Sequence, residues 1–180
     1  KYAVVGALSV GLVAFLLVWN TGIIQRNAAA VTVDGEKYSA ADVQYYLRSL
    51  MLQNGISSTS SLKSMTMNST TGETMYDYLK SQAVERLVTC AALDKQAAEE
   101  GFAMSDDTQT QVDDQLKQLE EQWVSAGYQS RDAFIRANYG PYMTYDRLVE
   151  LFTRDMRVSE YSTQFSDSLS YSDADYEKYY

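Results

Sequence analysis

The side chains in this sequence that are best suited to chemistry are carboxylates, and several stand in adjacent pairs. Asp106-Asp107, Asp113-Asp114 and Glu120-Glu121 fall within one segment of helical periodicity. Adjacent residues on a helix point in different directions, so their oxygens do not converge on one point. A metal cage or an acid/base pair needs convergent groups. We therefore expect these carboxylates to form a solvated outer face.

Other reactive residues are scarce. The chain has no His, which removes the commonest metal ligand and the usual general base near neutral pH. Its only Cys, Cys90, falls on the apolar side of a predicted helix, where a buried structural thiol is expected. The sequence contains no phosphate loop, zinc-ligand spacing or nucleophile elbow. It predicts no catalytic residue, no metal site and no cofactor.

Charge argues against one further class of partner. The formal net charge is -9, whereas binding to nucleic acid phosphates needs a basic face. We therefore do not expect nucleic acid as a partner, and the acidity favours a solvated domain.

The longest helical pattern runs from Thr74 to Gly101, and the other helices are expected to gather around it. Its apolar residues recur at three- and four-residue steps and form one wide stripe, which a single helix cannot bury alone. Further helices are predicted after Ser105, Ser130, Thr144 and Ser172. The second helix has a narrow apolar seam, typical of an antiparallel helix pair, made of Val112, Leu116, Leu119, Trp123 and Ala126.

The N-terminal segment has a different character. No charged residue occurs from Tyr2 to Gln25, which is long enough to cross a bilayer once. Residues 1–25 are predicted to be a transmembrane anchor, with a cleaved signal peptide ending near Ala28-Ala29-Ala30 as the alternative. The expected lipid-facing residues are Val4, Leu8, Leu12, Phe15, Leu16 and Trp19. We expect a cytoplasmic N-terminus and an extracytoplasmic helical domain in the cytoplasmic membrane.

Between the anchor and the helices, residues 26–38 are predicted to form a linker and a short β-hairpin that turns at Asp34-Gly35. Ser39 and Asp42 resemble a capping box that opens a helical domain over residues 39–180. Within it, residues 57–74 are rich in Ser and Thr and are predicted to be a surface loop. The fold class is therefore mainly α: one transmembrane helix, a small hairpin and a helical bundle.

Four stretches in this order resemble a known family. They are AAVTVDGEKYSAADVQYYL, ERLVTCAALDKQAAEEGFAMSDD, the pair GYQSRDAFIRANYG and DRLVELFTRDMRV, and SYSDADYEKYY. Together they resemble the N-terminal chaperone region of the PrsA/SurA-type extracytoplasmic peptidyl-prolyl isomerases, a helical domain of the trigger-factor type. The resemblance covers residues 28–180 and rests on the order of the elements, because no single motif is specific. It implies a SurA N-domain-like bundle that acts as a chaperone or foldase on exported polypeptides.

The sequence departs from that family in three ways. No Cys follows the hydrophobic segment, so the lipid anchor of PrsA-type proteins is not expected. The Ser/Thr-rich insert is unusual. The parvulin isomerase domain with its His residues does not occur in these residues. Since residues 172–180 read as the start of a helix, we expect a C-terminal part beyond Tyr180, where an isomerase would lie.

A chaperone surface needs adaptable apolar side chains rather than catalytic groups, and this chain has seven Met and fifteen Tyr. Those expected in loops and at helix ends are the candidate client-binding residues, although each could instead seal a helix junction. They are Met65, Met67, Tyr128, Tyr139, Tyr142, Met143 and Tyr145.

The predicted function is therefore a membrane-anchored extracytoplasmic chaperone or foldase module. Its expected partners are unfolded or exported polypeptides and the lipid bilayer. The alternative is a structural or adaptor subunit, docked through its transmembrane helix into a complex with other membrane proteins, because Gly6 and Gly11 permit close helix packing.

Overall fold

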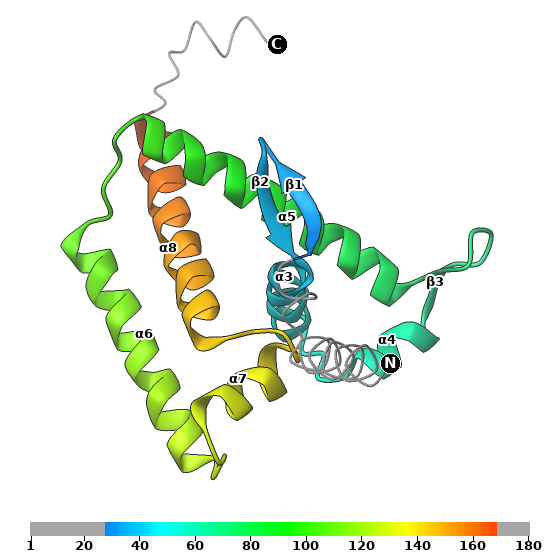
Figure 1. The fold of residues 1–180 in the computed structure, drawn as a ribbon. Helices are drawn as coiled ribbons and strands as arrows, with labels where there is room; N and C mark the ends of the chain where they lie inside the picture. Colours follow the sequence, from blue (N-terminus) through cyan, green and yellow to red (C-terminus); the bar gives the residue numbers. More distant parts are fainter. Residues whose placement is uncertain (1–27, 169–180) are drawn as a thin grey trace, which may run out of the picture.

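The computed structural model describes residues 28–168, and helices dominate them (Figure 1). In chain order the elements are β1 (Ala29–Val33), β2 (Glu36–Ser39), α3 (Ala40–Gln53), α4 (Thr59–Ser64), β3 (Thr66–Asn68), β4 (Glu73–Thr74), α5 (Met75–Glu99), α6 (Asp106–Ser125), α7 (Arg131–Tyr139) and α8 (Tyr145–Ser168). The prediction of a mainly helical domain with one small N-terminal hairpin is confirmed.

The hairpin β1–β2 has the predicted turn. Val33 pairs with Glu36, so Asp34 and Gly35 form a two-residue turn, and both have positive φ angles of 49° and 87°. A right-handed twist of the two strands favours that backbone, which glycine adopts without a steric penalty. The hairpin packs on α3 and α5, and this contact buries the Tyr38 side chain completely.

Helices α3 and α5 form the centre of the domain (Figure 1). The apolar stripe predicted on α5 is buried through Leu79, Ala83, Leu87 and Ala91. Cys90 is half-buried against this core, where burial raises the pKa of its thiol. A raised pKa keeps the thiol protonated and poorly nucleophilic, as expected for a structural cysteine.

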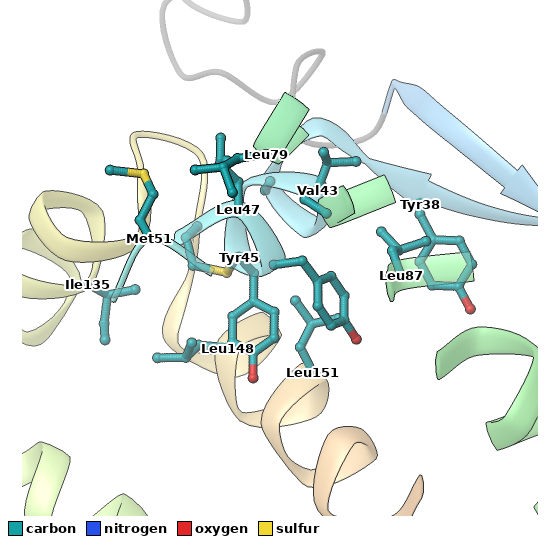
Figure 2. Packing of buried hydrophobic residues seen from close by; sticks show 14 of the residues in the cluster. Tyr38, Val43, Tyr45, Leu47, Met51, Leu79, Leu87, Ile135, Leu148 and Leu151 are labelled. Atoms are coloured by element: carbon teal, nitrogen blue, oxygen red, sulfur yellow. The ribbon is translucent and has the colours of Figure 1, made fainter. Parts of the chain in front are cut away.

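Helix α8 closes the core from the other side of α3. Figure 2 shows the Tyr45 ring extending from α3 towards Leu148 and Leu151 of α8. Leu151 is fully buried and Leu148 nearly so, and α7 adds Ile135 at the neighbouring edge. Helix α8 packs closely against α5, and it reaches α3 through large side chains.

Buried polar contacts fix α8 against α3. The carboxylate of Asp42 accepts a hydrogen bond from the Ser39 backbone N–H at 2.6 Å and from Arg147 Nε at 2.7 Å. About one turn further along α3, the hydroxyls of Tyr46 and Tyr45 donate hydrogen bonds to Asp155 of α8 at 2.6 and 3.2 Å. Burial raises the pKa of Asp155, although both tyrosine hydroxyls act in the opposite direction.

A second, smaller apolar cluster lies at the far end of α8. It joins Ala97 of α5, Val112 of α6, and Val158 and Tyr161 of α8, all of which are buried. The Tyr161 hydroxyl donates to Glu100 at 2.8 Å, and Phe102 meets the Tyr161 ring edge-on at 5.4 Å. This cluster holds the start of α6 against α8, so the two helices run side by side (Figure 1).

The predicted loop over residues 57–74 is wrong, because this segment forms α4 and the hairpin β3–β4. The Ser58 hydroxyl accepts a hydrogen bond from the Ser60 backbone N–H and so caps α4, while Leu62 is buried against the core. Serine is unfavourable inside a helix, but at the N-cap its hydroxyl replaces a missing backbone acceptor. One buried leucine then fixes the segment on α5.

Two predicted features lie outside the described residues. The anchor over residues 1–25 and the helix start over residues 172–180 are not among those that the structure describes. Between residues 28 and 168, no helix combines the length and the apolar character that crossing a membrane requires.

The two capping boxes of the domain allow a matched test of the Asp42 contact. We expect Asp42→Ala to lower the free energy of unfolding by about 3 kcal/mol, because it removes a helix cap and leaves Arg147 without its buried partner. The control is Asp77→Ala, which removes the equivalent cap of α5 at an exposed site that has no arginine partner. Urea unfolding followed by circular dichroism should give a clearly smaller loss for the control. Equal losses would mean that the ion pair contributes nothing.

Candidate functional site

An uncharged cleft lined largely by apolar residues lies between α3, α6, α7 and α8. Its volume is about 280 Å³. One wall comes from α3 and the opposite wall from α6, while α7 and α8 lie between them. The lining residues are Tyr45, Ser49, Leu52, Gln115, Leu116, Leu119, Gln122, Tyr139, Leu148 and Phe152.

None of the described residues that line this cleft carries a charge. Leu116, Leu119 and Phe152 are only half-buried. Leu52, at the end of α3, has a relative exposure of 56%. The polar groups present are neutral amides, a serine hydroxyl and tyrosine hydroxyls, which can both donate and accept hydrogen bonds. The cleft therefore offers apolar surface together with groups that can form hydrogen bonds with the N–H and C=O groups of a polypeptide backbone.

The cleft is open because α6 packs against α7 and α8 rather than against α3. The sequence predicts that the apolar seam of α6 packs against a neighbouring helix, and this prediction is only partly right. Val112 is buried, but Leu116, Leu119 and Trp123 are half-buried and Ala126 is exposed. Over its second half the apolar face of α6 is only partly covered: Leu119 and Trp123 pack against the core, and Leu116 and Leu119 form a wall of the cleft.

A cluster at the junction of α6, α7 and α8 holds this wall in place. Glu120 accepts hydrogen bonds from the Trp123 indole and, at 2.9 Å, from Arg131. The two hydrogen bonds lower the pKa of the Glu120 carboxyl group, and the one from Trp123 has the larger effect. The guanidinium of Arg131 also lies over the Tyr145 ring at 3.7 Å from its centre. Because three helices meet in one network, the far end of α6 is fixed as well as its start.

Tyr139 lies where the cleft meets the end of α7. Its ring stacks on Tyr45 with centroids 6.4 Å apart. Burial raises the pKa of its hydroxyl, and this group can donate a hydrogen bond at neutral pH as any tyrosine hydroxyl can. The next residue, Gly140, ends α7 with φ 110° and ψ 160°, a conformation that is essentially restricted to glycine. A Cβ atom at this position would lie 2.3 Å from the Gln44 side chain.

Of the seven predicted client-binding residues, the structure places only Tyr139 in the cleft. Met65 and Met67 are half exposed, but they lie on the β3–β4 side of the domain. Tyr128 is exposed beside Phe134, and Tyr142 and Tyr145 are half-buried at helix junctions. Met143 is fully buried in the core, so its assignment to an exposed rim is wrong. It follows a helix end, but the turn after Gly140 directs it inwards.

Sequence reasoning missed most of the cleft, including Tyr45, Leu52 and Phe152. Two of these have a recognisable signal. Leu52 directly follows the buried Met51, and Phe152 directly follows the buried Leu151. Consecutive large apolar residues cannot both point to one face of a helix. A doublet at the edge of a stripe therefore indicates a second apolar surface.

Residues 28–168 contain no group of three or more His, Cys, Asp or Glu side chains placed to hold a metal ion. The side chains that line the cleft offer apolar contact and neutral hydrogen bonds.

Gly140 allows a test of how the end of α7 is positioned. We expect Gly140→Ala to lower the free energy of unfolding by about 2 kcal/mol, mainly because alanine is strained at φ 110° and ψ 160°, and in smaller part because its Cβ displaces the end of the Gln44 side chain. Gly127→Ala is the control, since Gly127 also has a positive φ, but nothing lies within 4 Å of its missing Cβ. Thermal unfolding should rank Gly140→Ala as the more damaging, and adding Gln44→Ala should restore part of the loss. A loss equal to that of Gly127→Ala would contradict the close approach.

Comparison with known proteins agrees with the fold and with the resemblance drawn from the sequence. The family model described as the SurA-like N-terminal domain matches residues 1–172. No curated protein and no solved structure matches the chain. The match spans nearly the whole sequence and confirms the resemblance to an N-terminal chaperone domain of the SurA/PrsA type. The chain therefore belongs to the family of SurA-like N-terminal domains.

Proposed function

We propose that this protein binds unfolded or newly exported polypeptides in the cleft between α3, α6, α7 and α8 and so prevents their aggregation. The family supports a chaperone-like folding function. The single observation that carries the finer proposal is an uncharged apolar cleft whose leucine and phenylalanine side chains are left half-exposed by the fold.

The composition of the cleft suits many clients rather than one ligand. Binding to apolar surface is non-directional, so different aliphatic and aromatic side chains can occupy the same space. The amides of Gln115 and Gln122 lie on the α6 wall and can accept or donate hydrogen bonds to any backbone. No charged side chain lines the cleft among the described residues. A hydrophobic client segment that enters the cleft therefore does not bury an unpaired charge, which would be costly.

The rigid walls favour the same proposal. A cleft that could collapse would bury its own leucines and lose its affinity for clients. Here α6 is held by the Val112 cluster at one end and by the Glu120 network at the other. The exposed apolar surface is therefore available before a client arrives, and binding does not require the helices to be rearranged.

The cleft proposal is tested by matched polar substitutions on the apolar walls. We expect the double variant Leu52→Gln with Leu116→Gln to bind an unfolded client at least about tenfold more weakly, because it replaces two apolar contacts. Suppression of light scattering by an aggregating protein and fluorescence anisotropy with an unfolded peptide measure the effect in the full 180-residue chain.

The control for this experiment is Val124→Gln. Val124 lies on the same helix as Leu116 and has a relative exposure of 63%, but it does not line the cleft. It should bind clients like the unaltered chain. If the double variant and the control protect the client equally well, the cleft is not the binding site.

We also propose that residues 1–25 anchor the domain in the cytoplasmic membrane, with the N-terminus in the cytoplasm and the helical domain outside. The support is the uncharged run from Tyr2 to Gln25, which is long enough for one crossing. Such an anchor would hold the cleft close to the site where exported chains emerge.

Alkaline extraction of membranes tests the anchor. The chain should remain in the membrane pellet, whereas Leu12→Arg with Leu16→Arg should release it, because each arginine at the centre of a span costs about 3 kcal/mol. Lys80→Arg keeps the charge at a site in α5 and is the control. Full release of the unaltered chain would contradict the anchor.

A further inference from the structure

A second pocket, of about 380 Å³, lies on the other side of Tyr139 from the apolar cleft. Three segments surround it: the second half of α3, the segment that enters α4, and the end of α7. Its chemistry differs from that of the cleft, since it contains the guanidinium groups of Arg48 and Arg136 and the hydroxyl groups of Ser57, Ser58 and Thr59.

This pocket has an unbalanced charge. Of the described residues that line it, none is Asp or Glu, although the whole chain carries a formal net charge of -9. Both arginines line this pocket without a carboxylate among its described lining residues, and an anion bound there would balance their charge.

Arg48 in particular has unused hydrogen-bonding capacity. Its Nη1 donates to the backbone carbonyl of Ser57 at 3.2 Å, and its Nε is buried without an acceptor. Among residues 28–168 it forms no ion pair. Arg136 pairs only with the exposed Asp132, one helical turn away at 3.7 Å. Guanidinium groups bind carboxylates through parallel N–H donors, so an oxyanion is the group that this pocket lacks.

We propose that the Arg48 and Arg136 pocket binds a carboxylate side chain of a polypeptide whose apolar residues occupy the adjoining cleft. This inference rests on the proposed function. Tyr139 lines both the pocket and the cleft, so an extended chain that crosses the end of α7 contacts the two in succession. The domain would then select apolar segments flanked by Asp or Glu over equally apolar segments flanked by neutral or basic residues.

Three peptides with one apolar core and different flanking residues test this selectivity in the full chain. Measured by fluorescence anisotropy, the Glu-flanked peptide should bind about tenfold more tightly than the Gln-flanked peptide, and the Lys-flanked peptide should bind most weakly. The preference should shrink at 1 M salt, because screening weakens the charge pairing. Arg48→Gln and Arg136→Gln should each reduce it, and the double variant should abolish it, while affinity for the Gln-flanked peptide stays unchanged.

The control variant is Lys80→Gln, which removes one positive charge from an exposed site on α5 outside the pocket and should leave the preference intact. Equal binding of the Glu-flanked and Gln-flanked peptides, with the cleft variants still impaired, would overturn the carboxylate pocket and leave the cleft standing. No binding of any peptide would overturn both proposals. Free glutarate that bound as tightly as the Glu-flanked peptide would show that the pocket serves small carboxylates instead of polypeptides.

Discussion

The arrangement of this domain depends on the polar contacts that hold α8 against α3. Asp42 pairs with Arg147, and Asp155 accepts hydrogen bonds from Tyr45 and Tyr46. Apolar packing alone permits neighbouring helices to slide, because it is non-directional. Buried hydrogen bonds have defined partners and become costly when they are broken. They therefore fix which turn of α8 faces α3, and α6 packs along α8, while α7 packs against α3, α6 and α8.

The open cleft follows from that arrangement. With α8 fixed and with α6 packed along α8, the apolar side chains in the second half of α6 are only partly covered. Stability comes from the core around α3 and α5 and from the smaller cluster at the far end of α8. The domain thus separates the residues that hold the fold from those that contact a client. Such a separation lets a chaperone expose leucine and phenylalanine without losing its own structure.

The pocket at Arg48 and Arg136 adds a directional element to this non-directional surface. An apolar cleft recognises almost any unfolded chain, whereas two guanidinium groups beside it favour chains with acidic residues near their apolar segments. Tyr139 separates the two environments and contacts both. Selectivity would therefore arise from the charges that flank a client segment rather than from its apolar residues.

The elements of the fold are local properties, and most of them can be predicted from the sequence. The Asp34-Gly35 turn, the caps at Ser39 and Ser105 and the stripe of α5 each depend on residues close together in the chain, so their patterns predict them. The same reasoning failed for residues 57–74, where one buried leucine outweighs a loop-like composition. The exposure of a given apolar residue depends on which distant helix covers it. The sequence predicts Met143 in an exposed loop and Leu119 in a packed helix seam, yet Met143 is buried in the core and Leu119 lines the cleft. This reversal arises in the tertiary fold, because the packing of α6 against α8 instead of α3 joins residues far apart in the chain.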